Sequence, residues 1–80
     1  MEAYILINAE AGKVWKVAEY LSRIKGMKMA QAVTGQFDVI AYVEFPRIED
    51  LAGIVEAIQG IEGVQRTRTA VAMAKRPSAL

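Results

Sequence analysis

Apolar residues recur along this chain with two periodicities, one typical of helices and one typical of strands. From Val14 they fall at offsets of 3, 4, 7 and 10 residues, which describes one face of a helix that Gly26 ends. The same offsets recur from Ile48, 34 residues later, and Gly60 then takes the place of Gly26. The pattern predicts two amphipathic helices of one design. Their apolar stripes are Val14, Val17, Ala18, Leu21 and Ile24, and Ile48, Leu51, Ala52, Val55 and Ile58.

Four further segments have the β-branched and aromatic composition of strands. They cover residues 4–8, 27–34, 37–45 and 64–73. The second and third are joined through Gly35-Gln36, which predicts a hairpin, and Pro46 closes the third because proline cannot donate to a strand ladder. The order βαββαβ predicts a ferredoxin-like α+β fold, in which a four-stranded antiparallel sheet carries both helices on one face.

Both faces of this predicted sheet carry apolar side chains. In residues 37–45 one parity is wholly apolar, while the other still places Ile40 and Tyr42 between Asp38 and Glu44. The first predicted strand repeats the feature. Two helices on one side leave the other side bare, and a two-fold partner is the commonest cover for such a face. The pattern therefore predicts a homodimer of the dimeric α+β barrel type, and with it a higher even-numbered oligomer.

The length and the residue types narrow the possible functions. Eighty residues are enough for one domain, expected over residues 1–74, with a flexible tail over residues 75–80. The chain has no cysteine and no histidine, so the commonest metal ligands and the commonest general base are missing. We therefore expect no metal, no cofactor and no catalytic residue.

The net charge and the apolar content argue against further classes of function. Ten basic and nine acidic residues leave a net charge of +1, which is not the electrostatic signature of a protein that binds nucleic acid or a membrane surface. Hydrophobic residues make up 54% of the chain, above the roughly 45–50% of soluble domains, yet no run approaches a membrane span. No basic segment precedes the first apolar stretch, so a signal peptide is not predicted and a cytoplasmic location is expected.

The hairpin tip Val33-Thr34-Gly35-Gln36-Phe37-Asp38 is the most function-like segment. Glycine turns expose backbone amides to a carboxylate and an aspartate pairs with an ammonium, so the tip has groups for both ends of an amino acid. The alternative is a simple turn in which Gly35 takes a positive φ and Asp38 bonds locally, and the residues alone favour it. If Asp38 binds a ligand, Asp38→Ala is expected to weaken binding and scarcely to change folding.

The last predicted strand offers further polar candidates. Thr67 and Thr69 share one parity and are possible ligand donors, although threonine is common in strands for its β propensity alone. Arg66 and Arg68 take the opposite parity and are interpreted as a guard against aggregation.

Two aromatic residues and one glycine loop accompany the first predicted helix. Trp15 and Tyr20 lie off its apolar stripe, so each is expected either to be partly exposed, to join an interface, or to complete the core along the sheet rim. The loop Glu10-Ala11-Gly12-Lys13 is interpreted as a helix entry, because a single glycine is weak evidence for an anion site.

Taken together, these residues resemble the C-terminal effector-binding domain, or RAM domain, of the Lrp/AsnC transcription regulators. The resemblance covers nearly the whole chain. It rests on Ala3-Tyr4-Ile5-Leu6-Ile7, the hairpin tip, Ile61-Glu62-Gly63-Val64 and Thr67-Arg68-Thr69. It implies a ferredoxin-like domain that dimerises through its sheet, dimers that assemble into rings, and a small amino acid bound between dimers at the loop that joins the second and third strands.

Carried over residue by residue, the resemblance implies a binding loop and two outer contacts. The loop is Gly35, Gln36, Phe37 and Asp38, and the outer contacts are Thr67 and Thr69. Full-length members carry a helix-turn-helix before this domain, whereas this chain begins at the first strand and so resembles the stand-alone members. It is expected to act on transcription or metabolism through a partner, either a full-length family regulator or another protein, without direct contact to nucleic acid.

Two other classes of protein share the topology. A cofactor-independent dimeric α+β-barrel enzyme needs polar groups between helices and sheet, whereas both helix stripes and the Val39, Ala41 and Val43 parity are apolar. An ACT-type regulatory domain binds its amino acid near the first strand-to-helix turn, where Gly12 is the only support. We therefore predict a ligand-binding module that is not an enzyme.

Overall fold

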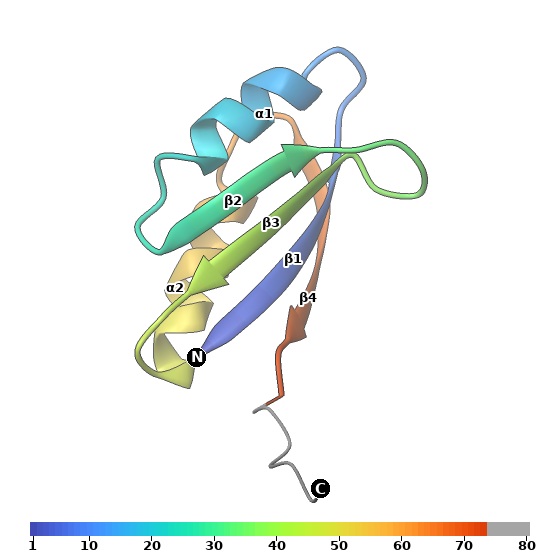
Figure 1. Cartoon of the computed structure of the whole chain (residues 1–80). Helices are drawn as coiled ribbons and strands as arrows, with labels where there is room; N and C mark the ends of the chain where they lie inside the picture. Colours follow the sequence, from blue (N-terminus) through green and yellow to red (C-terminus); the bar gives the residue numbers. More distant parts are fainter. Residues whose placement is uncertain (74–80) are drawn as a thin grey trace, which may run out of the picture.

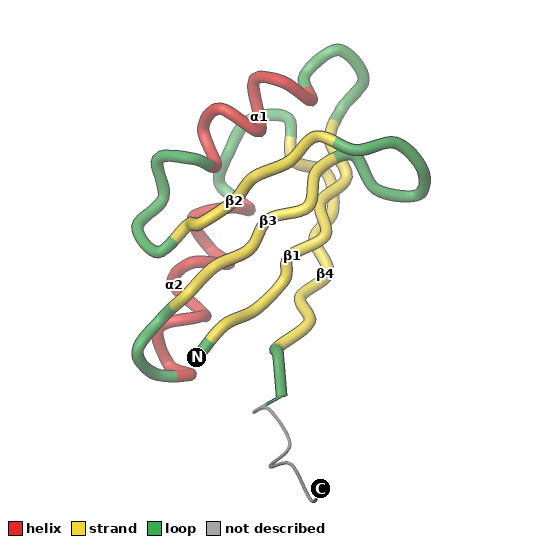
Figure 2. Tube along the Cα trace, viewed as in Figure 1, coloured by secondary structure: helices red, strands yellow, loops and turns green. Residues whose placement is uncertain are grey.

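The computed structural model describes residues 1–73, so the tail predicted over residues 75–80 lies outside the described part of the chain. Six elements follow one another in the predicted order (Figures 1 and 2). They are β1 (Glu2–Ala9), α1 (Val14–Leu21), β2 (Met27–Ala32), β3 (Val39–Glu44), α2 (Ile48–Gln59) and β4 (Val64–Val71). The βαββαβ order is confirmed.

The four strands form one antiparallel sheet in the order β2-β3-β1-β4. β1 lies in the middle, with Ile5 paired to Ala41 of β3 on one side and to Thr69 of β4 on the other. Both helices lie behind the sheet in the view of Figure 1, and the opposite face carries no helix. This arrangement is the ferredoxin-like fold that the sequence pattern predicts.

The core lies between the helices and the sheet. Alternate residues of β1 and β3 point into it, because successive side chains of a strand face opposite sides, and α1 and α2 contribute two fully or nearly fully buried residues each. No polar or charged residue is buried within residues 1–73. The core residues are Ala3, Ile5, Ile7, Ala9, Val17, Leu21, Val39, Ala41, Val43, Phe45, Leu51 and Ile58.

The elements differ from the sequence prediction mainly at their ends. α1 ends at Leu21, so Ile24 packs against the core from the following turn. In α2 the inward face holds Ile54, while Ala52 of the predicted stripe is exposed and Ile48 is 47% exposed. The hairpin loop is longer than predicted, because β2 ends at Ala32 and β3 begins at Val39.

Gly26 explains how the chain passes from α1 into β2. Its φ is +92°, and a Cβ placed there would lie 2.6 Å from the carbonyl oxygen of Glu44. Its own carbonyl oxygen accepts a hydrogen bond of 2.9 Å from the Glu44 N–H. Only glycine permits this backbone conformation together with so close an approach to β3, so Gly26 anchors the start of β2.

Candidate functional site

The β2–β3 loop, residues 33–38, projects beyond the end of the sheet (Figure 1). Gly35 at its tip has a φ of +114°, and a Cβ there would meet no atom within 4 Å. This glycine therefore serves the backbone of the turn and leaves open space around it. Gly35 and Gln36 are exposed, whereas Phe37 and Asp38 are half-buried at the base.

Asp38 holds the base of the loop against the end of β1. Its Oδ2 accepts a hydrogen bond of 2.8 Å from the Ala9 N–H, and its own N–H donates to the Ile7 carbonyl at 2.9 Å. Within residues 1–73 the other carboxylate oxygen accepts no hydrogen bond. The local bonding that the turn interpretation predicts is present, and the other carboxylate oxygen has no hydrogen-bond partner among these residues.

Two more hydrogen bonds brace the loop. The Asn8 side-chain amide donates to the Gln36 carbonyl at 2.8 Å, and the Val33 N–H donates to the Asp38 carbonyl at 2.9 Å. Asn8 was not singled out by the sequence analysis, because asparagine at a strand end is a common turn residue and nothing in the pattern links it to a loop 28 positions away. These hydrogen bonds hold the loop against the end of β1 and across its own base.

Thr67 and Thr69 lie apart from this loop in a single chain. They face the helix side of β4, opposite Ile7 and Ile5 of β1, and β1 separates them from β3. Two strand spacings amount to roughly 10 Å. The Thr67 hydroxyl oxygen lies 3.2 Å from the Gln59 amide nitrogen at the end of α2, and Thr69 is exposed. One chain alone therefore does not bring the threonines to the loop.

A small ion cluster closes the neighbouring turns at the same end of the sheet. The Lys13 ammonium lies 3.1 Å from Glu62 and 3.5 Å from Glu10. The hydrogen bond to Glu62 and the charge of Glu10 raise the pKa of Lys13, and the Lys13 ammonium lowers the pKa of Glu62. Gly12 has a φ of +84° in this turn, which agrees with a helix entry.

The helix-free face of the sheet carries a central apolar group. Tyr4 pairs with Tyr42 and Leu6 with Ile40 across β1 and β3, and Met29 of β2 lies beside Tyr42. The two tyrosine rings have their centroids 5.1 Å apart, and Tyr4 remains 46% exposed. In a single chain this face is therefore apolar, aromatic and in contact with water.

Charged side chains lie at both ends of this face. Glu2 and Glu44 pair directly across β1 and β3 at one end, and Arg66 and Arg68 of β4 lie beside Asn8 and Leu6 toward the other. The Tyr42 hydroxyl donates to Glu2 at 2.7 Å, and this bond raises the pKa of Tyr42 to about 12. The arginines, interpreted from the sequence as a guard against aggregation, make one end of the face basic, while at the other end the two glutamates are joined by Lys28, 3.9 Å from Glu44.

Trp15 stands out of α1 beside the β2–β3 loop. Its side chain is 78% exposed and lines a shallow hollow of about 660 Å³ with Val33 and Thr34. Tyr20 is 42% exposed and has the Arg23 guanidinium 5.2 Å from its ring centre. One expectation from the sequence was that these two rings complete the core, and neither ring does so in this chain.

Along residues 1–73 no helix has both the length and the apolar character needed to cross a membrane. In the same range no three acidic side chains come together as a metal site would require.

Comparisons with known proteins agree on one family. The family model described as Lrp/AsnC ligand binding domain matches residues 2–78. An uncharacterized HTH-type transcriptional regulator of Pyrococcus furiosus is 30% identical over 73 residues, which are 91% of this chain and 49% of that protein. The chain thus spans about half the length of the curated relatives it matches.

Solved structures share the fold. The crystal structure of TTHA0845 from Thermus thermophilus has a TM-score of 0.89 at 28% identity, covering 96% of this chain and 98% of that one. The transcriptional regulator NMB0573 from Neisseria meningitidis, solved as a complex with L-Met, has a TM-score of 0.80 at 18% identity, covering 99% of this chain and 55% of that one. The second likeness shows the fold alone.

Proposed function

The chain belongs to the Lrp/AsnC ligand-binding domain family, and from this premise we propose that it senses a small amino acid at the β2–β3 loop and forms oligomers that complete the site. The relatives are transcription regulators, so the family role is regulatory sensing. The chain acts in this proposal through a partner protein, without catalysis and without direct contact to nucleic acid.

One observation carries the proposal: the β2–β3 loop is braced at its base and open at its tip. Hydrogen bonds from Asn8 and Ala9 hold it, while a side chain at Gly35 would meet nothing within 4 Å. A rigid, exposed loop with a glycine tip offers preorganised backbone donors. Because it projects from the chain, it does not enclose a ligand alone, and a neighbouring copy is needed to close the site.

The chemistry of the loop suits an amino acid. Backbone amides near Gly35 and Gln36 would bind its carboxylate, and the Asp38 carboxylate would pair with its ammonium through the oxygen that does not bind Ala9. Phe37 would shield the pair from water. Thr67 and Thr69 are proposed as outer contacts in the assembled site, since β1 separates them from the loop within one chain.

A fold relative supports the ligand class. The Neisseria meningitidis regulator is described as a complex with L-Met, a small amino acid with an apolar side chain. At 18% identity this likeness extends to the fold alone, so the identity of the effector rests on experiment.

The helix-free face is the proposed dimer surface. A two-fold axis that reverses the strand direction would bring Glu2 and Glu44 of one copy over Arg66 and Arg68 of the other. The same operation would stack the tyrosine-rich centres of the two sheets. Complementary charges at both ends of an apolar patch suit a self-complementary two-fold interface. A second copy of this chain is therefore the occupant we propose for the face.

A thermal-shift screen of the twenty amino acids, followed by calorimetry with the best one, tests the ligand proposal. Asp38→Asn keeps an oxygen for the Ala9 N–H and removes the charge, so folding should persist. Affinity should fall about 10- to 150-fold if Asp38 pairs with the ammonium. Glu56→Gln, an exposed position on α2 outside the loop, is the control because it also removes one negative charge. Equal affinity of wild type and Asp38→Asn would remove the loop from the site.

A further inference from the structure

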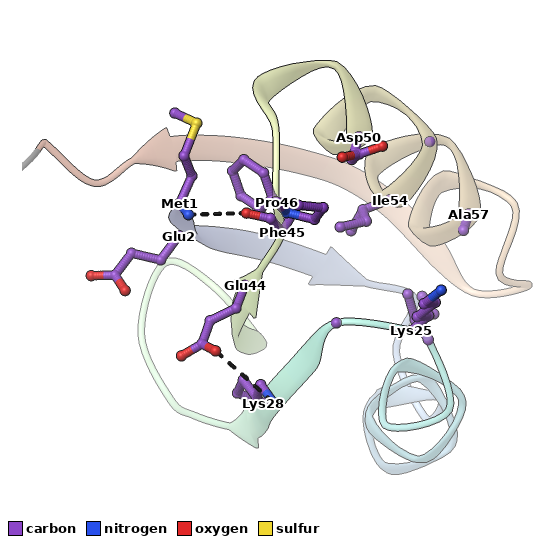
Figure 3. A pocket seen from close by; sticks show the side chains of 13 residues that line it. Met1, Glu2, Lys25, Lys28, Glu44, Phe45, Pro46, Asp50, Ile54 and Ala57 are labelled. Carbon is purple, nitrogen blue, oxygen red and sulfur yellow. Dashed lines mark hydrogen bonds and ion pairs between the residues drawn. The ribbon is translucent and has the colours of Figure 1, made fainter.

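A cleft of about 990 Å³ lies at the end of the sheet opposite the β2–β3 loop (Figure 3). One wall is α2, which contributes Gly53, Ile54 and Ala57, and the other is the turn that leads into β2, with Ile24 and Lys25. The side chains of Ile24 and Ile54 are only half-buried, so both walls keep apolar surface in contact with water. The volume lies at the upper end of the range of about 300–1,000 Å³ that is usual for small-molecule sites.

The glycine in the α2 wall has no structural reason within the described chain. Gly53 lies in the interior of α2, and glycine is the least favourable helix-interior residue after proline. It does not adopt a positive φ, and a Cβ there would meet no atom within 4 Å. Neither backbone geometry nor packing among residues 1–73 requires glycine. The missing side chain leaves the wall open beside Ile54, so an apolar body can lie close to the helix.

The carboxylates that line the cleft are already engaged by neighbouring residues. One of them accepts a hydrogen bond of 3.1 Å from the Arg47 N–H and lies 3.8 Å from the guanidinium of the same residue. The second lies 3.9 Å from the Lys28 ammonium, and the third accepts the Tyr42 hydroxyl at 2.7 Å. In that order these carboxylates belong to Asp50, Glu44 and Glu2. The acidic side chains of the cleft therefore do not call for a cation from a ligand.

The two lysines of the lining differ in this respect. Lys28 pairs with Glu44 along the rim, whereas Lys25 forms no ion pair in the part of the chain that the structure describes. Ile54 lies between Lys25 and Pro46 in Figure 3, so apolar surface leads away from the unmatched ammonium. A lysine ammonium is a compact single charge that suits one carboxylate, while phosphate recognition favours the fork of an arginine, which the described lining lacks. The cleft thus matches one negative charge at the end of an apolar body.

We propose that this cleft is a second small-molecule site, which takes an apolar monocarboxylate of the medium-chain fatty acid type. The carboxylate pairs with Lys25, and the hydrocarbon chain lies over Ile54 in the space that Gly53 leaves open. Such a ligand has no second charge, so Asp50 stays with Arg47. The proposal goes beyond the proposed function, because the cleft is built by one chain and needs neither the β2–β3 loop nor a second copy.

Calorimetry of the full chain with hexanoate, octanoate and octanol tests the chemistry of the ligand. Each methylene buried against the apolar walls should raise the affinity about fourfold, so octanoate should bind about 15-fold more tightly than hexanoate, at one molecule per chain. Lys25→Gln should weaken octanoate binding about two- to fivefold, as expected for an exposed ion pair. The same substitution should leave octanol binding unchanged, because octanol has no charge for Lys25 to pair with.

Two substitutions on α2 test the place of binding. Gly53→Leu fills the open wall and should weaken the binding of octanoate and octanol at least tenfold, while the better helix former keeps the chain folded. Ala52→Leu is the matched control, since Ala52 is exposed on the same helix and does not line the cleft. It adds the same side chain to α2 and should leave both affinities unchanged. Circular dichroism of the two variants checks that each is folded.

The variants also separate this proposal from the loop. Octanoate binding that falls with Gly53→Leu, and not with Ala52→Leu or Asp38→Asn, supports the cleft. Equal loss in both α2 variants, loss with Asp38→Asn alone, or no heat from wild type at millimolar octanoate overturns it. Octanoate binding that Lys25→Gln leaves unchanged overturns the carboxylate as the recognised group and points to a neutral apolar ligand. None of these results bears on the amino-acid screen, so the proposed function stands or falls separately.

Discussion

Asp38 has one structural contact and one proposed ligand contact, and a pair of substitutions separates them. Its Oδ2 accepts the Ala9 N–H at 2.8 Å at the half-buried base of the loop. Asp38→Ala leaves that N–H without a partner, whereas Asp38→Asn keeps an acceptor of the same shape. The structure therefore replaces the expectation that Asp38→Ala scarcely changes folding, because the carboxylate joins the loop to the end of β1.

The size of the expected change in Tm follows from the type of hydrogen bond that is lost. A hydrogen bond to a charged group contributes about 1.5–3 kcal/mol, and one kcal/mol moves the Tm of a domain of this size by about 4–8 °C. Asp38→Ala should therefore lower the Tm by about 6–24 °C, whereas Asp38→Asn should retain most of the wild-type stability. Calorimetric unfolding of both variants without ligand measures this. A Tm of Asp38→Ala within about 2 °C of wild type would refute the structural role of the bond.

Three further predictions concern the sheet and its edges. Leu6→Glu, which places a charge in the proposed dimer face and leaves the core untouched, should weaken dimerisation at least tenfold in light scattering; an unchanged dimer would locate the interface elsewhere. An alkaline absorbance titration should show the pKa of Tyr42 near 12, and Glu2→Gln should lower this pKa. Because the pKa is raised in the folded chain, the contribution of the Tyr42–Glu2 hydrogen bond to stability is complete below pH 10 and is lost between about pH 10 and 12. Gly26→Ala should reduce the free energy of unfolding by at least about 1–3 kcal/mol in urea titrations, because its φ is +92° and Glu44 lies against it; wild-type stability would contradict the close approach.

The fold could be predicted because two rhythms in the chain are unambiguous. The 3.6-residue stripe that begins at Val14 and again at Ile48 has no strand alternative, and the alternation in β3 has no helical one. The same alternation placed Tyr42 and Val43 on opposite faces, and the structure has Val43 buried and Tyr42 on the helix-free side. Local periodicity decides these features, so no long-range contact is needed to predict them.

The ends of the elements and the side of α2 that packs against the core could not be predicted without the tertiary structure. Ile54 replaces Ala52 on the inner face because it fills the space beside Gly26, where its Cδ1 lies 3.7 Å from the position of a Cβ. Which residue of α2 faces inward depends on a segment far away in the chain, and the periodicity of a single helix does not reveal that segment. The same reason hides the bond from Ala9 to Asp38, whose partners are 29 residues apart.

The sequence by itself determined the element order, the buried faces of α1, β1 and β3, and the hairpin tip as a candidate loop, because periodicity and turn chemistry are local properties. Only the tertiary structure decided which side chains meet. It separated Thr67 from the loop by the width of β1, placed Glu2 and Glu44 at the end of the helix-free face opposite the arginines, and opened a cleft at Gly53. Each of these depends on strand register and helix placement, which are set by packing across the whole domain.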